Sequence, residues 1–110
     1  MRKDDTLGAT TVDSSISTPE DALELARQRT GLTAIEADSW REGLAVLIEA
    51  MNASTNIAPH GIDYLTENIV AALSNRLRVH DYVRRHPEVL QETIERPVVT
   101  LGMPRTGTTE

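Results

Sequence analysis

The chain has 110 residues, enough for one modest domain, and 39% of them are apolar, with one Trp, two Tyr and no Phe. Its formal net charge of −6 argues against a general nucleic-acid or anionic-membrane binder, because both rely on Lys and Arg to offset negative charge. The absence of cysteine excludes a disulfide framework, a Cys-ligated metal and a thiol nucleophile. No apolar run reaches the length of a membrane span or forms a secretory signal, so a cytoplasmic protein is expected.

The first predicted element follows a polar stretch. Residues 1–17 are rich in Thr, Ser and Asp without a sustained period, which is typical of a flexible tail. A helix is predicted at 19–30, because Thr18 can cap it and Pro19 suits the first helical position. Gly31 is the expected stop. This helix opens a helical region that we assign to residues 18–95.

Two further helices are predicted at 39–52 and 60–85 from apolar residues that recur every three or four positions. The recurring residues are Trp40, Leu44, Leu47, Ile48 and Met51 in the first, and Ile62, Leu65, Ile69, Leu73 and Leu77 in the second. The longer helix should end before Pro87, because the residue preceding a proline avoids helical geometry. Residues 87–95 then indicate a turn or short helix followed by extended chain.

A β-strand is predicted at 97–101, where Val98, Val99 and Leu101 lack a clear alternation, as in a strand buried on both faces. One strand cannot make a sheet, because its backbone donors and acceptors need neighbouring strands. The fold class is therefore α/β, with N-terminal helices leading to the first strand of a parallel sheet. We assign residues 96–110 to this strand and a phosphate-binding loop, and expect a truncated domain.

The loop after this strand carries the chemistry. Gly102 and Gly107 have the spacing G-x-x-x-x-G of nucleotide-binding loops, in which glycine lets backbone N–H groups approach a phosphate closely. In the NTPase motif a Lys follows the second glycine, but here that residue is Thr108. The cation of this loop is instead Arg105, two residues before the second glycine.

The segment "GMPRTGTT", Gly102 to Thr109, resembles the 5′-phosphosulfate loop of sulfotransferases that use 3′-phosphoadenosine 5′-phosphosulfate, in the bacterial branch of that family. The loop pattern there is close to G-x-P-R-[ST]-G-T-T, preceded by a buried strand. The upstream segments "NRL", "RHPE" and "IERP" also resemble that branch. The resemblance covers residues 30 to 109 and is strongest over the last 35 or so. It implies a parallel-sheet fold with a P-loop-like turn.

The resemblance implies a role for each loop residue. Arg105 would contact the 5′-phosphosulfate and stabilise charge on the leaving phosphate, while Thr106, Gly107, Thr108 and Thr109 would bind its oxygens. The partners would be the nucleotide sulfate donor and a hydroxyl-bearing small molecule, with no metal and no nucleic acid. Because the family's other sites lie beyond the loop, we expect the N-terminal portion of such an enzyme, inactive alone and prone to self-association. Glu110 departs from the family, which has an apolar residue there.

Two other readings remain open: another P-loop nucleotide-binding protein, and a non-catalytic helical interaction module in which the loop is a relic. His60, His80 and His86 do not share one helical face by their spacing, so a metal site is not expected. The arginines between 76 and 85 are interleaved with acids, which is typical of a solvated, ion-paired helix end.

Overall fold

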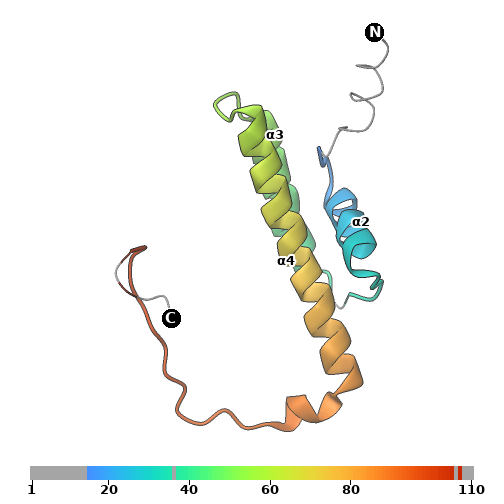
Figure 1. The fold of residues 1–110 in the computed structure, drawn as a ribbon, viewed down its shortest axis with the longest axis vertical. Helices are drawn as coiled ribbons and strands as arrows, with labels where there is room; N and C mark the ends of the chain where they lie inside the picture. Colours follow the sequence, from blue (N-terminus) through green and yellow to red (C-terminus); the bar gives the residue numbers. More distant parts are fainter. Residues whose placement is uncertain (1–14, 36, 106, 108–110) are drawn as a thin grey trace.

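A computed structural model describes residues 15–35, 37–105 and 107 of the chain, and its ordered body is helical (Figure 1). The helices are α2 (Pro19–Thr30), α3 (Ser39–Ala53) and α4 (Pro59–Arg85), followed by a short 3-10 helix, η1 (Pro87–Gln91). The three predicted helices are therefore confirmed, as is the short helix after Pro87. Residues 1–14 of the expected flexible tail lie outside the described residues.

Helix α2 begins and ends where its local sequence requires. The Thr18 Oγ1 accepts a hydrogen bond from the Asp21 N–H at 3.2 Å, and Asp21 Oδ2 accepts from the Thr18 N–H at 3.0 Å, a reciprocal capping box. Hydrogen bonds from the backbone N–H groups of Ser17 and Thr18 to its carboxylate hold the pKa of Asp21 below its ordinary value. At the other end Gly31 has φ +72°, a left-handed conformation that glycine adopts at low cost.

Helices α3 and α4 form a hairpin joined at the end of the body opposite η1, and α2 packs beside them (Figure 1). A 12-residue helix such as α2 is marginal in water by itself, so its packing against α4 is what keeps it folded. An Arg29–Glu67 pair joins the two helices at the surface, with two N–H···O bonds of 2.7 and 2.8 Å. Such an exposed pair fixes the register of the helices more than it stabilises them.

The hydrophobic core lies where the three helices meet. It consists of Ala22, Leu23 and Ala26 from α2, Ile48 and Met51 from α3, and Ile69, Val70, Leu73 and Leu77 from α4, together with Ile16. Ile16 lies before the predicted start of the helical region at residue 18, and its carbonyl accepts a hydrogen bond from Asn52 Nδ2 at 2.9 Å. The packed body therefore begins earlier than the polar composition around Ile16 suggests.

The predicted strand at 97–101 is not formed: within the described residues the structure contains no β-strand. Residues 92–101 are extended and exposed, and they leave the end of η1 as a single segment (Figure 1). The physical reason is that the described chain offers no second strand to accept and donate backbone hydrogen bonds. This segment also explains a radius of gyration of 18.2 Å, against about 13 Å for a compact domain near 100 residues.

None of the helices in the described part of the chain has the length and apolar character needed to cross a membrane.

Candidate functional site

The extended segment presents the candidate phosphate-binding loop at its far end, away from the helical body (Figure 1). Pro104 and Arg105 form a turn, and Arg105 has φ +68°. A positive φ in a residue other than glycine is uncommon and costs energy, so it marks a position where function is worth testing. Gly107 has φ +82°, and a Cβ built there would meet nothing within 4 Å. Glycine is thus required at 107 for its backbone conformation and not for space.

Backbone conformations of this kind point successive N–H groups toward one side, which is how a loop forms an anion-binding concavity. Arg105 is exposed, and within the described residues it forms no ion pair. Of the site residues expected from the sequence, the structure brings Arg105 and Gly107 together at the tip of the segment. Thr106, Thr108 and Thr109 lie outside the described residues.

The ion-paired helix end that the sequence predicts is present at Arg84 and Arg85, whereas Arg76 and Arg78 form no ion pair with the described residues. Asp81 accepts from Arg84 at 3.1 Å and from Arg85 at 2.9 Å, and these arginines hold the pKa of Asp81 below its ordinary value. His86 lies against Glu88 and stacks on Tyr82 with ring centroids 4.5 Å apart. Within the described residues no three His, Asp or Glu side chains gather as a metal site would require.

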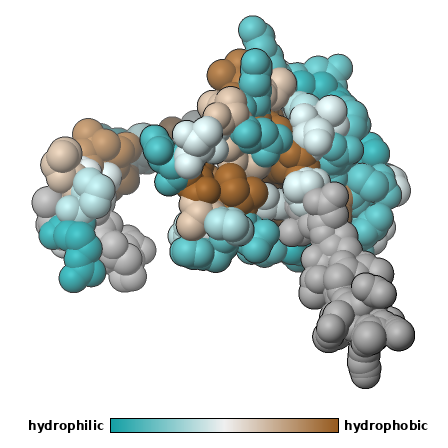
Figure 2. Space-filling view, turned by 90° about the horizontal axis from the view of Figure 1, so that it is seen from above, coloured by the Kyte–Doolittle hydropathy of each residue, from teal (hydrophilic) through white to brown (hydrophobic). Residues whose placement is uncertain are grey.

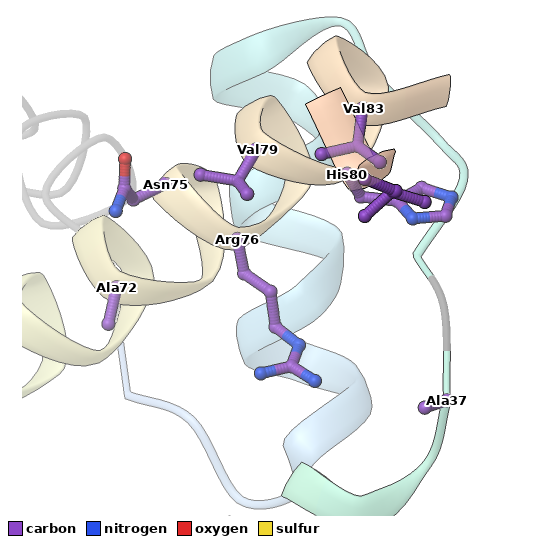
Figure 3. Close-up of a pocket in the computed structure, with 8 residues that line it drawn as sticks. Ala37, Ala72, Asn75, Arg76, Val79, His80 and Val83 are labelled. Carbon is purple, nitrogen blue, oxygen red and sulfur yellow. The ribbon is translucent and has the colours of Figure 1, made fainter. Parts of the chain in front are cut away.

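A groove along α4 was not predicted. It consists of two open depressions of about 610 and 270 Å³, which share Ala72 and Arg76. Figure 3 shows the larger one, with the Arg76 side chain extending from α4 into the space between this helix and the chain at Ala37. We call the combined feature the Arg76 groove. Its wall residues are Ala37, Trp40, Leu44, Leu47, Ile69, Ala72, Leu73, Asn75, Arg76, Val79, His80, Val83 and Leu90.

The apolar periodicity of α3 and α4 could have indicated this groove only in part. Leu47 belongs to the predicted apolar face of α3, yet it is 50% exposed, because it lies beside the groove and not in the core. Val79 and Val83 lie outside the predicted stripe of α4. Their side chains form a second apolar face on this helix, and the sequence gives no local signal of what covers that face.

Comparison of this chain, with its helical body, extended apolar segment and glycine loop with a central arginine, against solved structures finds a match among the sulfotransferases. The chain is similar to the crystal structure of sulfotransferase STF9 from Mycobacterium avium, with a TM-score of 0.79 and 47% sequence identity over 89% of this chain. The match covers 25% of the mycobacterial protein. The resemblance to the sulfotransferases is thus confirmed. No protein-family model and no curated protein sequence matches the chain.

Proposed function

We propose that this chain forms the N-terminal portion of an enzyme that transfers a sulfuryl group from 3′-phosphoadenosine 5′-phosphosulfate to a hydroxyl acceptor. The observation that supports this most is the loop: an exposed Arg105 without an ion pair in the described chain, two residues before a glycine at φ +82°. The 47% identity to a sulfotransferase supports the same activity class.

In this proposal the loop holds the 5′-phosphosulfate. As the acceptor oxygen bonds to sulfur, the bond between sulfur and the 5′-phosphate oxygen breaks, and negative charge develops on that phosphate. The Arg105 guanidinium stabilises this charge, and hydrogen bonds to ionised groups of this kind are among the stronger ones in proteins. Thr106, Thr108 and Thr109 donate hydroxyl hydrogen bonds, and the backbone around Gly107 donates N–H groups. The proton of the acceptor leaves to a base that we do not assign to this chain.

The 110-residue chain alone should bind nucleotide weakly. It spans one quarter of the sulfotransferase that it matches, and within its described part the loop rests on no sheet. Ordering each loop residue costs about 1–2 kcal/mol, which one arginine and a few amides do not offset. We therefore expect a dissociation constant for adenosine 3′,5′-bisphosphate no tighter than about 1 mM and no measurable sulfuryl transfer.

The test uses a chimera in which this chain replaces the matched quarter of the Mycobacterium avium sulfotransferase. Arg105→Ala should weaken binding of adenosine 3′,5′-bisphosphate by about 10- to 100-fold, because a charge-assisted hydrogen bond contributes about 1.5–3 kcal/mol. Arg96→Ala is a matched control: Arg96 is also an exposed arginine of the extended segment, with φ +52° and no ion pair among described residues. Equal losses in the two variants, or a chimera that does not bind the nucleotide, would refute the proposal.

The alternative is a helical interaction module, and the Arg76 groove is the observation that favours it. A titration of the free 110-residue chain with adenosine 3′,5′-bisphosphate distinguishes the two functions. Saturable micromolar shifts at Arg105 and Gly107 on titration with the bisphosphate would contradict our view that this chain needs further structure to form its site.

A further inference from the structure

The Arg76 groove combines an apolar surface with an arginine that forms no ion pair with the described residues. Val79 is 55% exposed and Leu90 is 73% exposed, and Figure 2 shows patches of apolar surface on the helical body among hydrophilic residues. Contiguous exposed apolar surface on a soluble domain commonly marks an interaction site. The groove therefore has the composition of an interface that is uncovered in this structure.

Arg76 differs from most arginines of the helical body. Those of α2, α3 and the end of α4 form ion pairs, namely Arg27, Arg29, Arg41, Arg84 and Arg85. Arg76 forms none with the described residues, although it lies at the junction of the two depressions, and no Asp or Glu among the described residues lines either one. An arginine covered by a partner needs a carboxylate there, because a buried unpaired charge is costly.

We propose that the Arg76 groove is the docking surface for the part of a sulfotransferase that lies outside the matched quarter, and that this part presents apolar side chains and one carboxylate that pairs with Arg76. The inference rests on the proposed function. The match to 25% of the mycobacterial protein leaves most of a sulfotransferase to cover this face. Leu90 of η1 lines the groove, and η1 leads directly into the segment that carries Val98, Val99 and the loop.

Charge distinguishes this occupant from a second copy of the chain. In a symmetric dimer the same patch meets itself, so two Arg76 side chains would face each other across the contact. The described residues of the groove walls supply no carboxylate to separate them. A different surface that carries an acid fits the groove better.

The experiment measures the melting temperature of the chimera and its variants. Val79→Asp should lower it by at least about 5 °C, because an unpaired carboxylate would be buried at the interface. Val46→Asp is the control: Val46 is 63% exposed on α3 and lines neither depression. In the free 110-residue chain, where both positions face solvent, the two variants should differ by less than about 2 °C.

A charge reversal tests the ion pair. Arg76→Glu should lower the melting temperature of the chimera more than that of the free chain, whereas Arg78→Glu, at a position of the same helix that lines neither depression, should change both equally.

Equal effects of Val79→Asp and Val46→Asp in the chimera, or a chimera that stays unfolded when its parent folds, would overturn the docking surface. A free chain that dimerises through the groove, with Val79→Asp making it monomeric, would overturn it in favour of a second copy. Nucleotide binding by the chimera reports on the proposed function separately, since a stable chimera that binds none refutes that function and leaves the docking result standing.

Discussion

Replacing Leu23 by alanine tests whether the packing of α2 on α4 holds the helical body together. Leu23 lies in the middle of α2 and is 0% exposed. The substitution removes three carbon atoms from the core, which at about 0.8 kcal/mol per buried methylene is a loss of about 2.4 kcal/mol. The cavity left behind raises the expected loss to about 3–4 kcal/mol. A domain of this size has a free energy of unfolding of about 5–10 kcal/mol, so the variant should lose a large part of it.

Urea unfolding followed by circular dichroism at 222 nm measures this loss. The matched control is Leu47→Ala on α3, where the side chain is 50% exposed and should cost less than about 1 kcal/mol in the free chain. Leu23→Ala should also increase amide exchange throughout α2, because a short helix does not persist without its packing. If the two variants lose equal free energy of unfolding, α2 does not dock as the structure has it.

Gly31→Ala should destabilise the chain by about 1 kcal/mol, whereas Gly43→Ala should stabilise it by about 0.5–1 kcal/mol: Gly31 has φ +72° and Gly43 lies inside α3 with open space for a Cβ. Thermal unfolding distinguishes the two signs. The pKa of Asp21 is lowered from 3.8 in the folded chain, so the ionised carboxylate should stabilise the fold above pH 3.8, and this stabilisation should be lost as the pH falls through the lower folded pKa. An acid titration of helicity should show this loss in the parent chain and not in Asp21→Asn. The Ser74 hydroxyl is buried with no hydrogen-bond partner among the described residues, so Ser74→Ala should raise the free energy of unfolding by about 1 kcal/mol in urea. Sedimentation should reveal concentration-dependent association of the chain that Val99→Asp weakens, since Val99 is 69% exposed on an unpaired extended segment.

The helices could be predicted from sequence because their signals are local. Thr18, Pro19 and Gly31 act within one or two turns of the residues they delimit, and apolar spacing reports the buried stripe of α4 directly. Ile69, Leu73 and Leu77 are buried as that stripe requires. These features depend on neighbours along the chain, so no knowledge of the remaining structure was needed to find them.

The strand and the groove could not be predicted in the same way, because both depend on distant surfaces. Val98, Val99 and Leu101 have the composition of a buried strand, but a strand forms only when another supplies its hydrogen bonds. Leu47 repeats with the apolar residues of α3, yet the separation of α3 from α4 leaves it beside a groove. Periodicity identifies a face that prefers burial. It does not identify which element buries that face.

The described chain therefore divides into two parts with different sources of order. The helical body has its own core, caps and helix-to-helix ion pair, and these hold without the loop. The segment from 92 to 105 is exposed along its whole length and contributes no residue to that core. Substitutions should separate accordingly: Leu23→Ala changes the stability of the body, whereas Arg105→Ala leaves that stability unchanged and alters nucleotide binding in the chimera alone. The Arg76 groove lies on the helical body, but its proposed function concerns the loop. The part of a sulfotransferase that we propose to dock there would include the sheet that orders the loop.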